Sequence, residues 1–157
     1  MTSLVCRYLL WSVDGGIYRA ELQQDGSVDQ STGRRLVVSG VDVAAFTVDY
    51  ANYRLLYPTS RNHAGSDSGV ILSTALDGSD AFVVRNDTAG GDDLLRVTCL
   101  TYHQPTDVFY WATHDGQLLG EELDRQSGVF HHNELLIEGS HFAAIAVWHP
   151  AAQPIPR

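Results

Sequence analysis

The sequence predicts an all-β fold, and two observations point to it. Short runs of Val, Ile, Leu, Phe and Tyr recur along the chain, and Gly, Asp, Asn, Ser or Pro interrupt them roughly every 8 to 12 residues, as expected for short strands joined by turns. Apolar residues rarely follow the i, i+3, i+4 spacing of a helix. A β-sandwich and a β-propeller share this rhythm, so the grouping of the strands decides between them.

The expected strands group into repeating units, each marked by an apolar run that ends in a large aromatic residue. These aromatic residues are Trp11, Tyr57 and Trp111, which lie 46 and 54 positions apart. A second strand is expected after each, over 16–23, 69–77 and 116–124, and a third over 35–38, 81–84 and 134–137. Another type of strand precedes the aromatic residue in the later units, over 43–50 and 95–102, and it appears once more over 142–148.

Units of four antiparallel strands, repeated about every 50 residues, are the sequence signature of propeller blades. The sequence therefore predicts an all-β chain that forms a partial β-propeller of about three four-stranded antiparallel blades within residues 1–149. The blade units cover roughly 8–39, 43–85 and 94–138, followed by a final strand over 141–149 and a Pro-rich tail over 150–157. The first unit lacks its first strand, and the final strand has no unit after it.

Several of these segments resemble the YWTD repeat, also called the LDL-receptor class B repeat. The resemblance is carried by Leu10-Trp11-Ser12 with residues 17–22, by Tyr110-Trp111-Ala112-Thr113 with residues 119–124, by Val48-Asp49-Tyr50 and by Leu76-Asp77-Gly78. It extends from Tyr8 to Trp148. The repeat's Asp after the aromatic pair is missing from all three units, and the Asp of its Val-Asp-Trp strand is kept once, as Asp49, so the blades are divergent.

Divergent blades of this kind look like those in the extracellular part of sevenless-type receptor tyrosine kinases. The resemblance implies a non-catalytic, protein-binding segment on the extracellular side of the plasma membrane, which meets a protein ligand or neighbouring receptor domains and uses no cofactor. It also implies that the kinase domain and the membrane span lie outside these residues, and the chain indeed contains no glycine-rich phosphate loop or His-Arg-Asp motif. The alternative is a fragment of a lactonase-type propeller hydrolase with a metal at the central channel, by analogy of fold alone.

The charge of the chain argues against two classes of partner. Its formal net charge is -9, from 19 acidic and 10 basic residues, and Arg34-Arg35 is its one basic pair. Nucleic acids and anionic lipids both need a positive surface, so neither is an expected partner. No apolar run approaches the roughly 18 to 20 residues of a membrane span, and the first ten residues do not resemble a signal peptide.

Candidate metal ligands in the sequence are better explained as residues of the surface or of blade turns. His131 and His132 are adjacent, so on a strand they point to opposite faces and chelate one ion poorly. The remaining histidines considered as ligands, His103, His114 and His149, fall at expected strand ends or turns. Asp92-Asp93 offers two acids where calcium needs six or more oxygen ligands. We therefore predict no metal site and no catalytic residue.

Three further features of the sequence bear on function. Asn86-Asp87-Thr88 is an acceptor sequence for N-glycosylation, so Asn86 is a candidate glycosylated residue if the chain is secreted. The apolar-free stretch over 62–69 does not match a nucleophile elbow and is interpreted as an enlarged hairpin loop that is solvated or binds a partner. Three states are open to Cys6 and Cys99: a disulfide between them, disulfides to cysteines outside this chain, or free buried thiols. Free buried thiols are the leading interpretation.

The repeated aromatic residues are expected to pack between blades, and the end blades are expected to expose apolar faces. The aromatic set is Trp11, Tyr57, Trp111 and Trp148. A propeller closes as a ring of about four to eight blades, so three blades leave two faces uncovered. Either the segment belongs to a longer chain, or its start lies inside one, or two copies self-associate through their open faces into a six-bladed ring. The first two are the leading interpretations, because the incomplete first unit and the unaccompanied final strand fit a cut from a longer chain better than an evolved end.

Overall fold

The chain is described by a computed structural model over residues 7–13, 15–39, 43, 45–59, 69–86, 97–124, 129–139 and 142–147. For residues 7, 86, 123–124 and 129–134 the backbone alone is described. In these ranges the regular structure consists of β-strands and one short 3-10 turn, Gln104–Thr106. The predicted all-β class is confirmed. Within the same ranges, no helix combines the length and apolarity that crossing a membrane requires.

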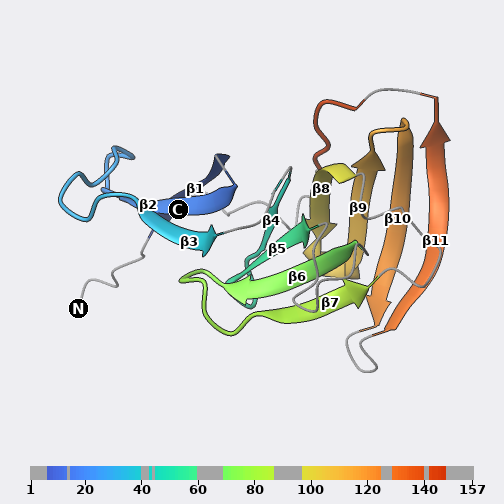
Figure 1. The fold of residues 1–157 in the computed structure, drawn as a ribbon, viewed down its shortest axis with the longest axis horizontal. Coiled ribbons are helices and arrows are strands. Elements are labelled where there is room, and N and C mark those ends of the chain that lie inside the picture. Colours follow the sequence, from blue (N-terminus) through green and yellow to red (C-terminus); the bar gives the residue numbers. More distant parts are fainter. Residues whose placement is uncertain are drawn as a thin grey trace.

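Within the described residues, eleven strands form three antiparallel sheets, drawn side by side in Figure 1. The first sheet contains β1 (Arg7–Val13), β2 (Gly16–Leu22) and β3 (Arg35–Ser39). The second contains β4 (Thr47–Asp49), β5 (Arg54–Thr59), β6 (Val70–Ala75) and β7 (Phe82–Asn86). The third contains β8 (Val97–His103), β9 (Val108–Thr113), β10 (Gln117–Asp124) and β11 (Val129–Glu138).

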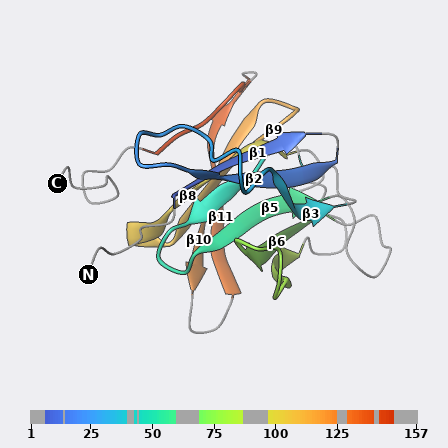
Figure 2. The same cartoon turned by 90° about the vertical axis from the view of Figure 1, so that its left-hand side faces the viewer.

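The three sheets stack face to face. Figure 2 looks onto the first sheet, with the other two behind it. Strands follow the chain order within every sheet, and the first strands of the second and third sheets, β4 and β8, contact each other near the middle of Figure 1. Stacked meander sheets whose first strands converge are the blades of a propeller. The structure is therefore a partial β-propeller, as the sequence predicts.

Side chains of the middle sheet alternate between two cores. Leu55 and Tyr57 of β5 pack toward the first sheet, whereas Leu56, between them, packs toward the third. In β6, Val70 and Leu72 join the first core, and Ile71 joins the second. Because successive residues of a strand point to opposite faces, continuous apolar runs in β5 and β6 bury both faces of this sheet.

Close backbone contact joins the first sheet to the second. The guanidinium Nη1 of Arg19, on β2, donates to the carbonyl oxygen of Leu76 at 2.8 Å. Two residues on, Gly78 has a φ of +89° and lies so close to β3 that a Cβ atom would overlap the carbonyl oxygen of Val37. Only glycine combines this backbone conformation with this approach, so the β6–β7 turn is fitted to the neighbouring sheet.

A second, partly charged core joins the middle sheet to the third. Phe109 and Trp111 of β9 are fully buried in it. Arg85, from β7, lies 5.1 Å above the Trp111 ring and pairs with the buried Glu121 of β10, with 2.6 Å between Nε and Oε2. Arginine suits this position because its flat guanidinium stacks on an aromatic ring while it binds a carboxylate.

Each sheet has one face that points toward the previous sheet in the chain and one that points toward the next, here called the N-side and C-side faces. The register of the strands makes Leu9, Leu55 and Phe109 equivalent residues on the N-side faces of the three sheets. Leu55 and Phe109 are 0% and 1% exposed, whereas Leu9 is 46% exposed. The N-side face of the first sheet is therefore exposed, whereas the equivalent faces of the second and third sheets are buried.

The C-side face of the third sheet is open in the same way. Val38, opposite Ile17, and Ile137, opposite Leu118, occupy equivalent positions on the first and third sheets. Val38 is 9% exposed, whereas Ile137 is 48% exposed. Both ends of the stack thus present apolar surface, because no sheet of the described chain covers them.

All three sheets carry a register shift at the same place. It lies between Ile17 and Tyr18 in β2, between Ile71 and Leu72 in β6, and between Leu118 and Leu119 in β10. A bulge adds local twist and bends the outer strand. Its recurrence shows that the three units share backbone geometry as well as strand order.

Two expected strands differ from the structure. The strand expected over 43–50 is shorter, since β4 covers Thr47–Asp49 alone. The final strand expected over 141–149 is not formed in its described part, because residues 142–147 carry no strand. A strand needs a neighbour to satisfy its backbone hydrogen bonds, and the described chain offers this segment no further unit with which to pair.

Replacing Gly78 by Ala should destabilise the stack more than the same change at Gly26. Gly26 has a similar φ of +85° in the β2–β3 turn, but no atom lies within 4 Å of the point that a Cβ would occupy there. Gly26→Ala should cost about 1 to 2 kcal/mol for the left-handed backbone, and Gly78→Ala about 2 to 4 kcal/mol because the overlap with Val37 adds to that cost. Urea unfolding measures both, and equal losses would contradict the close contact.

Removing the Trp111 ring should be among the most damaging single changes. Trp111→Ala should lower the free energy of unfolding by about 3 to 5 kcal/mol, because the fully buried ring leaves a cavity between two sheets. Tyr50→Ala is the matched control, since Tyr50 is 75% exposed, and it should change stability by less than about 0.5 kcal/mol. A near-neutral Trp111→Ala would rule out an inter-blade packing role.

Candidate binding site between the second and third sheets

A half-open pocket lies where the second and third sheets diverge, at the end that carries the β4–β5 and β6–β7 turns. Its volume is about 540 Å³. The second sheet and its turns contribute most of the lining, and the third sheet contributes two aromatic residues. The lining residues are Asp49, Asn52, Arg54, Leu56, Ser73, Phe82, Val83, Val84, Tyr102 and Phe109.

The β4–β5 turn is shaped by Asp49, the residue that keeps the Asp of the YWTD-like strand. Its Oδ1 accepts hydrogen bonds from the backbone N–H groups of Ala51 and Asn52, at 3.1 and 3.2 Å. Its Oδ2 accepts one from the side-chain Nδ2 of Asn52 at 2.6 Å. A short acidic side chain that caps the backbone in this way fixes a tight turn. Asp49 thus brings Asn52 to the rim of the pocket.

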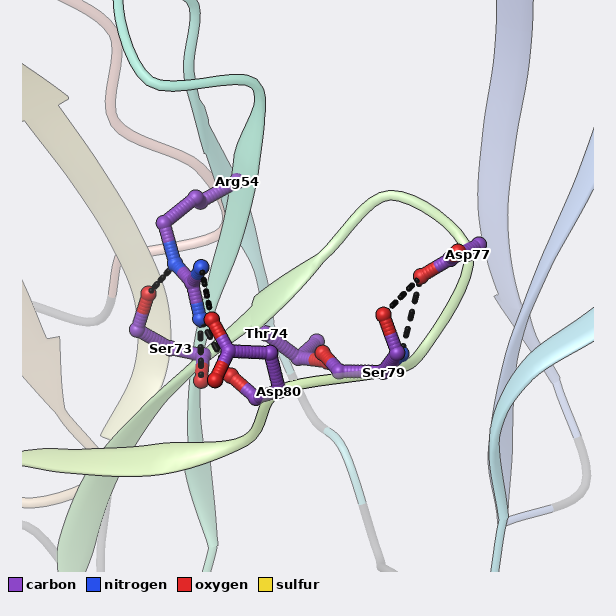
Figure 3. Close-up of polar contacts among 6 residues, drawn as sticks. All are labelled: Arg54, Ser73, Thr74, Asp77, Ser79 and Asp80. Carbon is purple, nitrogen blue, oxygen red and sulfur yellow. Dashed lines mark hydrogen bonds and ion pairs between the residues drawn. The ribbon is translucent and has the colours of Figure 1, made fainter.

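Arg54 is the central polar residue of the site, and Figure 3 shows its partners. Its Nε donates to Ser73 Oγ at 2.7 Å, its Nη1 to Asp80 Oδ2 at 2.9 Å, and its Nη2 to the backbone oxygens of Ser73 and Asp80. The guanidinium carbon also lies 4.5 Å from the centre of the Phe82 ring. Asp49 is directly opposite Arg54 in the strand register, yet Arg54 pairs with Asp80 instead.

The β6–β7 turn presents Asp80 to Arg54. Asp77 Oδ1 accepts hydrogen bonds from the N–H and the hydroxyl of Ser79, at 2.9 and 2.6 Å, and these bonds lower the pKa of Asp77 below its usual value. The Ser79 carbonyl accepts a bond from Thr74 Oγ1 at 2.8 Å. Asp80 itself has a φ of +53°, a left-handed conformation that Asp tolerates better than most residues. Its carbonyl and carboxylate oxygens both reach Arg54 as a result.

Aromatic side chains form the apolar walls. Phe82 is half exposed at the rim, whereas Phe109 is buried at the base. The rings of Tyr102 and Phe109 stack with their centres 4.6 Å apart, and the Tyr102 hydroxyl donates to Asp107. Next to it, His103 Nδ1 and Thr106 Oγ1 are 2.7 Å apart. These bonds hold the β8–β9 turn and the third-sheet wall in one arrangement.

The chemistry of this site is that of binding. Arg54 and Asp80 form an ion pair, and Asp49 is the acidic residue among those that line the pocket. A pocket with fixed aromatic walls and a hydrogen-bonding rim can accept an apolar side chain whose tip is polar. Across the described ranges, no three His, Cys, Asp or Glu side chains are grouped so that they could hold a metal ion.

The structure places the predicted aromatic residues in different surroundings. Tyr57 and Trp111 are buried in the two cores, and burial raises the pKa of the Tyr57 phenol. Trp11 is half buried on the open N-side face of the first sheet, where its ring stacks on Tyr18 with centres 5.9 Å apart. Trp148 lies outside the described residues.

Other predicted sites are only partly covered by the structure. Asn86 is the last residue of β7, and its side chain is not described. Cys99 is a buried free thiol, whereas Cys6 lies outside the described residues. His103 is buried at the end of β8 and His114 is exposed in a turn. The remaining predicted positions are outside the described chain, or have backbone alone, and are His131, His132, His149, Asp92, Asp93 and residues 62–68.

Sequence reasoning missed the pocket because its residues come from two turns and two sheets. Two local signals were nevertheless visible. Asp77-Gly78-Ser79 repeats Asp25-Gly26-Ser27 at the equivalent turn of the first sheet, with the same two hydrogen bonds from Ser27 to Asp25. Asp49 ends a strand directly before the turn over residues 50–53. These signals mark the turns, but not the pairing of Arg54 with Asp80.

Comparison with known proteins supports the fold. No protein family matches the sequence, and no curated protein matches it. Twenty-six chains of solved structures are similar in fold. One belongs to the structure titled "Crystal structure of Nidogen/Laminin Complex", with 11% identity and a TM-score of 0.60. The match covers 83% of this chain and 44% of that one, so this chain spans less than half the length of its structural neighbour. At this identity the likeness shows a shared fold.

Proposed function

We propose that this chain is a protein-binding segment of the extracellular β-propeller of a cell-surface receptor, and that the pocket between the second and third sheets binds the partner. The observation that carries the proposal is the pocket, with its half-exposed Phe82 at the rim and its fixed Tyr102–Phe109 wall. Its volume is within the range of preformed binding sites, roughly 300 to 1,000 Å³.

The physical argument is that a partner loses little free energy in ordering this pocket when it binds. Most of the energy of a protein interface comes from a few anchor side chains that enter pockets. The walls of this pocket are already ordered by Arg54, Ser73 and Asp80, so a partner does not have to order them. The acidic Asp49 and the net charge of -9 favour a partner side chain that is neutral or basic.

Three further observations support the receptor assignment. The YWTD-like segments resemble those of sevenless-type receptors, and they form blade-like sheets. A structural neighbour with the same fold comes from a complex of two proteins, by its title. The third is the N-glycosylation acceptor sequence at Asn86, which fits an extracellular chain because such acceptors are modified in the secretory pathway. A kinase domain would belong to the longer protein.

Shortening Phe82 should weaken partner binding without unfolding the chain. The chain would be tested by biolayer interferometry against a panel of purified extracellular proteins that includes laminin. Phe82→Ala should weaken the binding that is found by at least about tenfold, because the rim anchor is lost. Leu135→Ala is the control, since Leu135 is exposed to a similar extent on β11 and lies outside the pocket. Equal effects, or no saturable binding by the chain, would contradict the proposal.

Asn86 should carry a glycan when the chain is directed through the secretory pathway. Expression behind a heterologous signal peptide should give a product whose mass falls on treatment with an N-glycosidase. Asn86→Gln should abolish this mass change, and Asn133→Gln should leave it intact, because Asn133 has no Ser or Thr two positions on. A secreted, folded chain without any glycan would remove this support for an extracellular site.

A further inference from the structure

The second sheet exposes large apolar side chains although it has a neighbouring sheet on either side. In the described part of its strands and turns, the large apolar side chains that are about half exposed or more are Tyr50, Tyr53, Phe82 and Val83. Phe82 and Val83 line the pocket, and Asn52, which also lines it, lies between the two tyrosines in the chain. The exposed apolar side chains of this sheet therefore gather at the mouth of the pocket.

This surface does not depend on which further blades complete a ring. A further blade would lie against an end sheet, whereas the pocket lies between the second and third sheets, which are both present. Tyr50 and Tyr53 belong to the β4–β5 turn, and turns lie at the ends of strands rather than on the faces that neighbouring blades cover. Apolar groups that stay exposed in such a place are typical of an interaction surface.

Left-handed backbone conformations gather at the same mouth. The described non-glycine residues with a positive φ are Tyr53, Asp80 and Asp107, at +54°, +53° and +54°. All three adjoin the lining of the pocket, because Tyr53 directly precedes Arg54, Asp80 binds Arg54, and Asp107 accepts the Tyr102 hydroxyl. Asp tolerates this conformation, but a bulky residue does not, and Tyr53 is 72% exposed, so packing offsets little of its strain. Such strain is characteristic of ligand-binding positions.

The charged groups described around this mouth are mainly acidic. They are Asp49, Asp77, Asp80 and Asp107, with Arg54 and Arg19 as the basic residues. Arg54 is already paired with Asp80, and Arg19 lies on the side of the first sheet, where it binds Leu76. Together with the net charge of -9, this arrangement favours a basic partner.

The chain itself shows which cation fits an aromatic ring beside a carboxylate. Two such units occur, Arg54 with Phe82 and Asp80, and Arg85 with Trp111 and Glu121. Arginine suits them because its flat guanidinium stacks on a ring while its N–H groups reach the acid, whereas a lysine ammonium has no flat face. The mouth of the pocket offers both partners again, since the tyrosine rings are exposed and the Asp80 side chain is 77% exposed.

We infer that the partner is a basic protein segment in which an arginine lies next to a large apolar residue. The apolar residue enters the pocket, and the arginine stacks on Tyr53 and binds the Asp80 carboxylate, which has room for about four hydrogen bonds. This inference rests on the proposed function, because it names the partner of the same pocket. It adds the β4–β5 turn to the binding surface.

The first test selects peptides from a random library displayed on phage, with the whole chain immobilised. The enriched peptides should place an arginine within a few positions of a large apolar residue. A parallel selection against the chain that carries Tyr50→Ser and Tyr53→Gly should lose this preference. A selection that enriches no peptide, or peptides with no more arginine than the unselected library, would overturn the proposal.

The second test removes the charge of the partner while keeping its shape. A selected peptide is remade with citrulline in place of its arginine, and the binding of both peptides to the chain is measured by fluorescence anisotropy. The citrulline peptide should bind at least about tenfold more weakly at about 0.05 M salt. The difference should shrink at about 0.5 M salt, because salt screens exposed charge pairs. Equal binding of the two peptides at low salt would contradict a site for arginine.

A variant of Tyr53 separates binding from folding. Glycine accepts the left-handed backbone, so Tyr53→Gly should leave the urea midpoint unchanged or raise it, while it weakens binding of the arginine peptide by at least about threefold. Leu135→Ala is the control and should change the binding by less than about twofold, since Leu135 is exposed on β11, outside the pocket. Unchanged binding by Tyr53→Gly would rule out stacking on this ring.

The results distinguish failure of this inference from failure of the proposed function. If Phe82→Ala abolishes binding but citrulline binds as well as arginine, the pocket binds a partner and the arginine assignment alone is wrong. If Phe82→Ala binds as tightly as the unmodified chain, the pocket is not the site and the proposed function fails.

Discussion

The structure depends on a sheet that cannot be stable alone. β5 and β6 carry apolar side chains on both faces, so the middle sheet needs a neighbour on either side before its burial outweighs the entropy of ordering it. The first and third sheets supply those neighbours. The first and third sheets have the same requirement, since each also has an apolar outer face that needs a neighbouring sheet. Stability of such a stack is a property of its contacts between sheets, which explains why repeats of this type come in closed or capped arrays.

The two inter-sheet contacts use different chemistry. The first combines an apolar core with backbone contact at Gly78 and one hydrogen bond from Arg19. The second includes the Arg85–Glu121 pair within an otherwise apolar core, against the Trp111 ring. A buried ion pair is a weak source of stability, but it penalises arrangements that separate the two charges. The charged contact therefore favours one alignment of the second and third sheets, and that alignment shapes the pocket beside it.

Much of the fold could be predicted from the sequence because the repeat is marked by large apolar residues that must be buried. Tyr57 and Trp111 mark the second strand of their units since only a core position accommodates such large rings there. Other features had no such signal. The register shifts depend on backbone geometry that many sequences allow. Along the sequence, Asp49 is closer to Arg54 than Asp80 is and also lies opposite it in the strand register, yet Arg54 binds Asp80. The segment 142–147 has the right pattern for a strand, but a strand also needs a neighbour, which no pattern within the segment can supply.

The contact of Gly78 with Val37 also has a geometric consequence. Backbone touches backbone there, so the turn sets the smallest distance between the outer parts of the first two sheets. Sheets in a ring fan out from the axis. The difference between their spacing at the rim and their spacing near the axis sets the angle that each blade occupies. A glycine at this turn keeps the angle small. A bulkier residue would widen it, and the circle would then hold fewer blades.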